Sequence, residues 1–518
     1  MDLMAGYDGM DMRPLLLSGG TIADGTGAPL SAGNLLIRGG AIAGLGDFAA
    51  PEDAEAIDCT GLTIAPGFID GHSHSDLQVL ENRPEKLLQG VTTEVVGNCG
   101  FSTYPAGEDR GPLHEFADGI LHGSGNWGWP AAADYLADAR KAARAGVASL
   151  LGHGTLRVWA AGHRLGALSG REVDCMERML DEALAEGAAG FSTGLMYSPG
   201  ASAPFEELER LVRVVARRGK TYATHMRDYS DRLVPAVEEQ LELARRTGCR
   251  LQISHLQAVG ERNWPLQQIA LDRIDEAARQ GVDVAFDCYP YTRGSTVLTQ
   301  LLPQWALEGG IQGLLSGLAD PARRARIAAG TEAALAQGWH GIIVAAVAGE
   351  KNQPQVGRTI AAIALDRARP PVETALDLLT EERGQVNILE MNQSEANLRQ
   401  TLSHPLSNVI SDGFYTAGRP HPRLHGTFPL LLGEISRERK WLSLPEAIRK
   451  ITEAPALRFG IARRGRLAPG WQADIVVFNP RTVGSPATYE DPEQPPSGIE
   501  YVFRDGCPLV KHGRVAAN

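Results

Sequence analysis

Residues 66–76 read Pro-Gly-Phe-Ile-Asp-Gly-His-Ser-His-Ser-Asp, a short apolar run followed by a cluster of polar side chains. The run Phe68–Asp70 predicts a buried strand, and His72 and His74 come directly after it. Side chains two residues apart in an extended segment point to the same side, so the two imidazoles share one face. Such a pair binds a metal or forms a simple hydrogen-bonded pair, and its place after a strand favours metal binding.

Further apolar runs with helical segments between them follow this stretch, which is the pattern of βα units repeated around a parallel sheet. One helix illustrates the pattern, because Leu208, Leu211, Val212 and Val215 form a single apolar stripe within Phe205–Arg218. The predicted barrel strands are Phe68–Asp70, Thr93–Val96, Ala148–Leu151, Ala189–Ser192, Thr221–Thr224, Leu251–Ser254, Val284–Asp287 and Asn408–Ser411. Together they fit an α/β fold of the TIM type, a (β/α)8 barrel.

The rest of the chain predicts two additions to this barrel. Residues 1–65 and 465–518 carry short strand signals separated by glycine turns, and they predict one small β-sandwich domain built from both termini. The barrel then spans residues 66–464. Before its eighth strand the chain is much longer than one βα unit requires, so region 300–400 is predicted to be an inserted lid subdomain over the barrel mouth.

Length and composition set the broad class of protein. The chain has 518 residues, more than the roughly 250–300 at which a single core stops growing, so at least two structural units are expected. Apolar residues make up 43% and charged residues 22%, which is ordinary globular usage. The formal net charge of −12 offers no basic surface to a nucleic-acid backbone, so we expect no nucleic-acid partner.

Apolar runs and cysteines indicate the compartment. A run such as Ile342–Ala348 is far shorter than the roughly 18 residues of a membrane span, and Met1–Met4 lacks a basic leader followed by an apolar stretch. The six cysteines show no CxxC spacing, so neither a disulfide framework nor a zinc ribbon is indicated. We therefore expect a cytoplasmic protein that does not enter a membrane. The oligomeric state stays open, with a homo-oligomer among the alternatives.

The active site of a TIM barrel lies where the strands end, and this rule selects a small set of polar residues. They are His72 and His74 after strand one, Cys99 after two, His153 after three, His225 after five, His255 after six, Asp287 after seven and Asp412 after eight. Imidazole and thiolate are zinc ligands, and three protein ligands with an open position for water are typical of catalytic zinc. A nearby carboxylate such as Asp412 is suited to carry a proton from that water to a leaving amine.

Single members of this set have simpler interpretations. Cys99 alone fits a small buried apolar side chain, and Asp412 fits a turn residue of the sequence Ser-Asp-Gly. His225 and His255 are separated by one βα unit and lie on adjacent strands, which makes two unrelated core histidines the weaker interpretation. His153 stays outside the predicted metal set, because it can equally satisfy a backbone group.

Longer motifs carry a family resemblance. They are PGFIDGHSHSD from Pro66, GVTTEVVGNCG from Gly90, GFSTGLMYSPG from Gly190, YATHMRD from Tyr222, LQISHL from Leu251, DCYPYT from Asp287, SDG from Ser411, HPRLHGTFP from His421 and RGRLAPGWQADIVVFNP from Arg464. With them the chain resembles the N-acyl-D-amino-acid deacylase (D-aminoacylase) branch of the metal-dependent amidohydrolase superfamily. The resemblance implies zinc-dependent hydrolysis of an N-acyl-D-amino acid to a carboxylate and a free D-amino acid.

The resemblance also implies a role for each matching residue. The implied metal ligands are Cys99, His225 and His255 for one tightly bound Zn²⁺, and His72 and His74, with Cys99 and Asp412 facing them, for a second and weaker position. Asp412 is also the implied catalytic acid–base. The implied substrate contacts are Tyr197, Tyr289 and Arg423, of which Arg423 is a sensible bidentate partner for an α-carboxylate. The simpler alternative is that His-Pro-Arg is a rigid turn whose arginine forms a structural ion pair.

Gln257 departs from the pattern of this branch, which usually has at that position a lysine that helps to hold the substrate carboxylate. A neutral amide brings no charge, and charge-assisted hydrogen bonds are roughly twice as strong as neutral ones. Gln257 therefore keeps a second substrate class open: an amide without a free α-carboxylate, or a cyclic amide of the hydantoinase or dihydropyrimidinase type. A non-catalytic scaffold is a remote third hypothesis, and the retained metal ligands argue against it.

Overall fold

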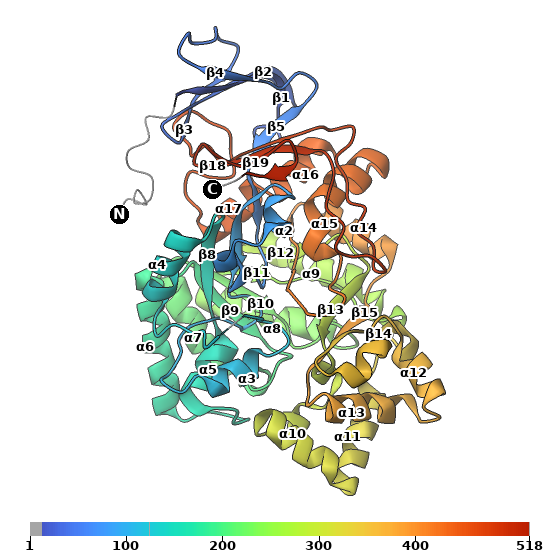
Figure 1. The fold of residues 1–518 in the computed structure, drawn as a ribbon. Coiled ribbons are helices and arrows are strands. Elements are labelled where there is room, and N and C mark those ends of the chain that lie inside the picture. Colours follow the sequence, from blue (N-terminus) through green and yellow to red (C-terminus); the bar gives the residue numbers. More distant parts are fainter. Residues whose placement is uncertain (1–12, 124, 517–518) are drawn as a thin grey trace.

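The computed structural model describes residues 13–123 and 125–516. Residues 1–4, on which the expectation of no leader rests, lie outside this described part. A parallel barrel forms the middle of the molecule, a sheet built from both termini covers one end of it, and an inserted subdomain projects from the other end (Figure 1). The predicted fold class is confirmed.

The barrel consists of parallel strands, and each predicted barrel strand has its counterpart among them. In sheet order they are β6 (Phe68–Asp70), β7 (Val91–Val96), β8 (Gly146–Gly152), β9 (Gly190–Gly194), β10 (Thr221–His225), β11 (Arg250–Ile253), β12 (Val284–Cys288) and β16 (Ser407–Val409). At the carboxyl rim, the His74 N–H donates to the Gly413 carbonyl at 3.0 Å and the Asp412 N–H to the His72 carbonyl at 2.9 Å. These bonds join the first and last strands beside the predicted ligands.

Helices surround the barrel and cover its apolar strands. The predicted helix is α7 (Phe205–Arg217), and Leu208, Leu211, Val212 and Val215 of its apolar stripe are fully buried. The other helices outside the insertion are α1 (Gln78–Glu81), α2 (Pro84–Leu87), α3 (Gly111–Ala117), α4 (Ala132–Ala142), α5 (His153–Ala161), α6 (Gly170–Glu186), α8 (Leu233–Thr247), α9 (Leu266–Arg279), α14 (Glu395–Ser403), α15 (Arg423–Leu430), α16 (Leu444–Lys450) and α17 (Glu453–Phe459). Within residues 13–123 and 125–516, no helix is long and apolar enough to span a membrane.

Strands from both ends of the chain share one mixed sheet, coloured blue and red in Figure 1. Its order is β20 (Arg514–Val515), β19 (Cys507–Lys511), β18 (Ile499–Arg504), β17 (Ile475–Phe478), β5 (Thr63–Pro66), β1 (Leu15–Ile22), β2 (Ser31–Arg38) and β3 (Ala41–Gly46), with β4 (Glu55–Asp58) beside β1. The antiparallel pair β5 and β17 joins the two halves. The chain passes from β5 through Gly67 directly into β6, and Gly67 N–H donates to the Asp474 carbonyl at 2.8 Å, so this sheet anchors the first barrel strand.

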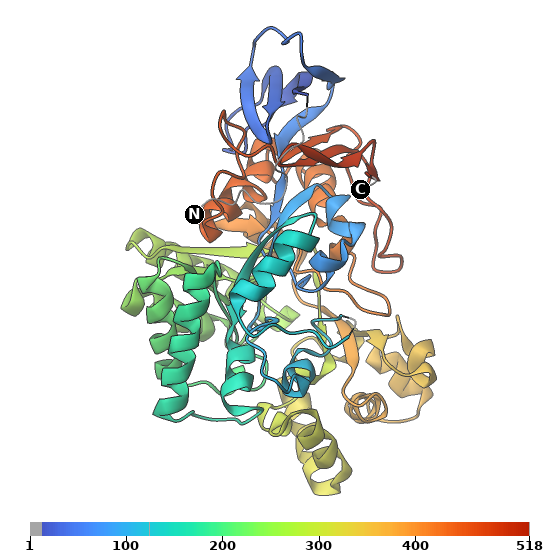
Figure 2. The ribbon, with the colours of Figure 1, turned by 60° about the vertical axis from the view of Figure 1, so that its left-hand side comes forward.

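The insertion between β12 and α14 has a small sheet and an apolar core of its own. Its elements are β13 (Arg293–Val297), β14 (Ile342–Val347) and β15 (Val386–Met391), with helices α10 (Gly310–Ala319), α11 (Pro321–Ala334), α12 (Ile360–Asp366) and α13 (Pro371–Glu381). β15 lies between its two antiparallel neighbours. Figures 1 and 2 both show the insertion, in yellow and orange, on the side of the barrel away from the terminal sheet. The predicted domain boundaries stay predictions.

Candidate metal centre and substrate pocket

Two groups of buried metal-ligating side chains share the thiol of Cys99 at the carboxyl end of the barrel. One group is His72, His74, Cys99 and Asp412, the other is Cys99, His225 and His255, and the ligand atoms of each group lie within 4.8 Å of one another. Cys99 Sγ is 3.3 Å from His72 Nε2 and 3.5 Å from His255 Nε2. The structure therefore brings all the predicted metal ligands together.

The local backbone aims several of these side chains inward. Cys99, His255 and Asp412 have φ angles of 53°, 35° and 49°, in the left-handed region that non-glycine residues seldom adopt. Gly97 precedes the cysteine with a φ of 79°, and a Cβ atom there would lie only 2.0 Å from the Leu150 carbonyl oxygen. A backbone of this kind costs about 1–3 kcal/mol per residue and is concentrated at functional sites. The motif Gly-Asn-Cys-Gly thus has a structural reason for its first glycine.

The surroundings of His225 show whether this arrangement fits a metal. Both of its ring nitrogens are buried without a hydrogen-bond partner among the described residues. Burial lowers the pKa of His225 well below its usual value, and the neighbouring His255 lowers it further, so the imidazole is in the neutral form that binds metals. Burial also raises the pKa of the Cys99 thiol to about 11, whereas a coordinating metal deprotonates a thiol. Thiolate with imidazoles is a donor set that suits zinc.

Asp287 holds two of these histidines in place. Its Oδ1 accepts the backbone N–H of His255 at 2.6 Å and lies 3.6 Å from Nδ1 of His72. Its Oδ2 accepts a hydrogen bond from Gln252 Nε2 at 2.8 Å. Carboxylates in such positions fix the orientation of metal-binding imidazoles. The sequence marks Asp287 only as a residue at a strand end, and the structure adds it to the candidate site.

Asp412 lies between two histidines and an arginine. Its Oδ1 is 3.3 Å from His72 Nε2 and 3.2 Å from His74 Nε2, and its Oδ2 is 2.9 Å from Arg423 Nη1. Burial opposes ionisation, but Arg423 and His72 outweigh it and hold the pKa of Asp412 well below its usual value. The carboxylate is therefore ionised.

Arg423 is buried behind the pocket wall, with 1% of its surface exposed. Its guanidinium stacks on the ring of Tyr289 at 4.6 Å and on that of Phe414 at 5.8 Å. Nη2 also donates to the Ser295 carbonyl at 3.3 Å. The charged contact of Arg423 in this structure is Asp412, and its predicted contact with a substrate carboxylate stays a prediction.

A buried network supports the loop that carries Asp412. Asp70 Oδ1 accepts the N–H of Ser411 at 3.0 Å, and Asp70 Oδ2 accepts a hydrogen bond from the Ser411 hydroxyl at 2.5 Å. Lys86 Nζ contacts both Asp70 and the Ser411 hydroxyl, and lies 3.8 Å from Glu94 Oε2. Because Asp70 ends β6 and Ser411 follows β16, the network joins the first and last barrel strands directly beneath the candidate metal centre.

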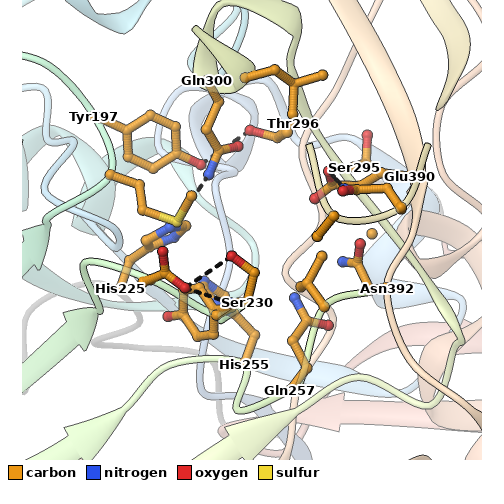
Figure 3. A pocket seen from close by; sticks show the side chains of 18 of the residues that line it. Tyr197, His225, Ser230, His255, Gln257, Ser295, Thr296, Gln300, Glu390 and Asn392 are labelled. Atoms are coloured by element: carbon orange, nitrogen blue, oxygen red, sulfur yellow. Dashed lines mark hydrogen bonds between the residues drawn. The ribbon is translucent and has the colours of Figure 1, made fainter. Parts of the chain in front are cut away.

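A cavity of about 400 Å³ opens beside the metal-ligating groups. Figure 3 shows Tyr197, His225 and Ser230 on one side of it and Gln257 and Asn392 on the other. The insertion supplies the further wall residues Ser295, Thr296, Gln300, Trp305, Gln337 and Glu390. The predicted substrate contacts Tyr197, Tyr289 and Gln257 line this cavity, whereas Arg423 does not. Within the described part of the chain, no lysine or arginine lines it.

His153, which the sequence prediction kept out of the metal set, lies in a different buried cluster. Its Nε2 is 2.9 Å from Glu207 Oε1, and Arg157 Nη1 is 3.2 Å from the same oxygen. All three side chains are almost completely buried. These contacts hold the three side chains together in the barrel wall, and none of the three belongs to the two metal-ligating groups.

Comparison with known proteins agrees with the geometry. The amidohydrolase family matches residues 55–510. The D-aminoacylase of Alcaligenes xylosoxydans xylosoxydans is 35% identical over 506 residues, covering 96% of this chain and 95% of that protein. The N-acyl-D-glutamate deacylase of the same organism is 36% identical over 500 residues, covering 95% and 93%.

Solved structures separate this branch from its distant relatives. N-acyl-D-glutamate deacylase from Bordetella bronchiseptica, complexed with zinc and a phosphonate that mimics the tetrahedral intermediate, has a TM-score of 0.82 and 34% identity, and the match covers 97% and 98% of the two chains. A D-hydantoinase has a TM-score of 0.53 and 15% identity, a likeness of fold alone. This chain belongs to the amidohydrolase family and, within it, to the D-aminoacylase branch that its motifs resemble.

Proposed function

We propose that this protein is a zinc-dependent amidohydrolase that cleaves the amide bond of N-acyl-D-amino acids, yielding a carboxylate and a free D-amino acid. The observation that carries the proposal is the thiol of Cys99, which two buried groups of metal-ligating side chains share next to Asp412. The branch supports it, since the related proteins named above are D-aminoacylase and N-acyl-D-glutamate deacylase. The D configuration of the substrate rests on these relatives.

Cys99, His225 and His255 would hold the tightly bound zinc ion. His72 and His74, with Cys99 and Asp412, would form the second and weaker position. Bound zinc lowers the pKa of a coordinated water to about 7 and polarises a carbonyl group. The buried thiol of Cys99 supports this ligand set, as do the ring nitrogens of His225, which have no hydrogen-bond partner among the described residues.

Asp412 would carry the proton in the reaction. The carboxylate would accept the proton of the attacking water at Oδ1 and deliver it to the nitrogen of the leaving amine, as general acid–base catalysis requires. Arg423 is 2.9 Å from Oδ2 and limits rotation of the carboxylate, so Oδ1 stays directed toward the histidines. Asp287 would keep His72 oriented through its contact with Nδ1.

The pocket residues Tyr197, Tyr289 and Gln257 would position the substrate. The hydroxyl of Tyr197 is 3.2 Å from Thr296 Oγ1, and the hydroxyl of Tyr289 donates to Gln257 Oε1 at 2.9 Å. Gln257 supports a second substrate class as well, because a wall with a neutral amide suits an amide without a free α-carboxylate. The hydantoinase likeness extends only to the fold, so cyclic amides are the more distant form of this alternative.

The test is a measurement of amine release by the zinc-supplied enzyme from three matched sets of substrates. They are N-acetyl-D-amino acids, their L enantiomers, and the D compounds with the α-carboxylate converted to a neutral amide. Hydrolysis of the D free acids, lost in Cys99→Ala and retained in the control Cys288→Ala, supports the proposal. If the enzyme prefers the carboxylate-free amides, its substrate belongs to the second class, amides without a free α-carboxylate. If the zinc-loaded protein hydrolyses none of the compounds, the proposal is refuted.

A further inference from the structure

Glu390 places a carboxylate in the pocket that pairs with no cation in the described part of the chain. The residue belongs to β15 of the insertion and lines the cavity. Its Oε2 accepts a hydrogen bond from the neutral amide of Gln337, with a distance of 2.7 Å to Nε2. Among the described residues it takes part in no ion pair within 4.0 Å. Removing a carboxylate from water without a cationic partner is unfavourable, so Glu390 offers an attractive site for a ligand cation.

The wall next to Glu390 adds a second acceptor. Asn392, two residues further along, is 1% exposed and lines the same cavity. Its Nδ2 is 3.4 Å from the Tyr289 hydroxyl, whereas its Oδ1 is buried without a hydrogen-bond partner among the described residues. Figure 3 shows Glu390 and Asn392 on the same side of the cavity. A ligand group with several N–H donors would satisfy both side chains.

The charged residues around the cavity also favour a cationic ligand. Asp228 and Asp231 line it in addition to Glu390 and Asp412, and in the described part of the chain no lysine or arginine does so. Burial raises the pKa of Glu390 to about 7, while Gln337, Asn392 and, least, Arg423 lower it. An acidic side chain of a substrate would meet this wall without a counter-charge, whereas a cationic side chain would supply the missing one.

We infer that the pocket selects N-acyl-D-amino acids whose side chain carries a positive charge, an ammonium or guanidinium group, and that Glu390 is the residue that recognises it. Asn392 Oδ1 accepts a further N–H of the same group, for which the planar fork of a guanidinium is well suited. The inference rests on the proposed function and names the substrate class of that site. It separates this protein from the relatives that are N-acyl-D-glutamate deacylases.

The experiment compares kcat/KM of the zinc-supplied, full-length enzyme for N-acetyl-D-arginine, N-acetyl-D-citrulline and N-acetyl-D-glutamate. Citrulline has nearly the shape of arginine but no charge, so the ratio of the first two isolates the cation. We expect arginine to be preferred by about tenfold or more, which is the effect of about 1.4 kcal/mol. N-acetyl-D-glutamate should be the poorest of the three substrates.

Glu390→Gln keeps the size of the side chain and removes its charge, so it should bring the arginine-to-citrulline ratio close to one while citrulline turnover persists. Asp366→Asn is the matched control, because it removes a carboxylate of the same insertion that is paired with Arg358 on the surface. A thermal melt of each variant checks folding, and the wild-type ratio tests the inference independently of any variant.

Two outcomes overturn the inference in different ways. The role of Glu390 is refuted if the wild-type enzyme hydrolyses the citrulline or the glutamate derivative as well as the arginine derivative. It is also refuted if Glu390→Gln leaves the arginine-to-citrulline ratio of kcat/KM unchanged. Either result leaves the deacylase activity standing. If the enzyme hydrolyses no N-acetyl-D-amino acid at all, not even a neutral one such as the leucine derivative, the proposed function is refuted and this inference with it.

Discussion

Nη1 of Arg423 lies 2.9 Å from Oδ2 of Asp412, in an ion pair whose two side chains are only 1% and 10% exposed. The same guanidinium stacks on Tyr289, which lines the pocket. One arginine thus contacts both the candidate proton carrier and the substrate wall. Two roles follow for it, fixing the carboxylate of Asp412 and binding the carboxylate of the substrate, and kinetics can separate them.

Replacing Arg423 with alanine should lower kcat by about 10²-fold, because an unheld Asp412 carboxylate no longer keeps its orientation. We expect this loss for free-acid substrates and for their α-amides alike, measured as separate kcat and KM values. Arg423→Lys should recover part of kcat, since it keeps the charge without the guanidinium fork. A rise in KM confined to the free acids, with kcat unchanged for the amides, would instead assign Arg423 to the substrate carboxylate.

Because Cys99 belongs to both metal-ligating groups, single substitutions should remove zinc in a defined pattern. Cys99→Ala should lose zinc from both positions, His225→Ala should lose the tightly bound ion, and His74→Ala should keep that ion. Zinc per chain, measured by inductively coupled plasma mass spectrometry after dialysis, reports this directly. Cys288→Ala is the control, since its thiol is buried outside both groups. Equal zinc content in Cys99→Ala and the control would contradict the shared thiol.

Sequence patterns could predict the barrel and the metal-ligating set because both are locally encoded. Each barrel strand is a short apolar run, and the ligand follows its strand within a few residues, as with His72 after β6 and Cys99 after β7. Parallel strands in a closed barrel bring their carboxyl ends to one rim, so position along the chain implies proximity in space. That reasoning needs no knowledge of side-chain packing.

The pocket wall could not be predicted in the same way. Glu390 and Asn392 come from β15 of the insertion, and no motif around them signals that this strand faces the metal centre. How the insertion docks depends on tertiary packing. Arg423 shows the same limit, because its residue type fits a carboxylate partner equally well in the pocket or behind it. Asp287 had a strand-end position but no pattern that marked its bond to His255.

The network beneath the centre should contribute strongly to stability. Lys86 is 1% exposed, and Lys86→Met would leave the Asp70 and Glu94 carboxylates buried without their cation. Breaking a buried ion pair from one side costs about 3–5 kcal/mol, which urea unfolding of the zinc-loaded protein would measure. Lys141→Met on the exposed face of α4 should change the free energy of unfolding by less than about 0.5 kcal/mol. Equal free energies of unfolding for the two variants would show that the network does not contribute to stability.

Lys450 should make stability rise with pH in alkaline solution. Burial lowers its pKa from 10.5 to about 8, and Nζ donates to Ser407 Oγ at 2.8 Å. Between these two values the unfolded chain binds more protons than the folded one, so the free energy of unfolding increases with pH.

Lys450→Met removes this titration together with the hydrogen bonds of the ammonium group. The variant should be less stable overall, and the stability gap between wild type and variant should widen from pH 7.5 to pH 9.5. Urea unfolding at the two pH values measures the gap, with the exposed Lys351→Met as the control. A gap that stays constant or narrows would contradict a lowered pKa.

Glu390 should make substrate choice depend on pH, because its pKa is raised to about 7 by burial. Below that value the protonated acid offers a cation no charge, and above it the carboxylate does. The kcat/KM ratio of N-acetyl-D-arginine to N-acetyl-D-citrulline should therefore rise between pH 6 and pH 8. The ratio cancels every titration that the two substrates share. It should be independent of pH in Glu390→Gln, and a flat wild-type ratio would show that Glu390 does not sense the side chain.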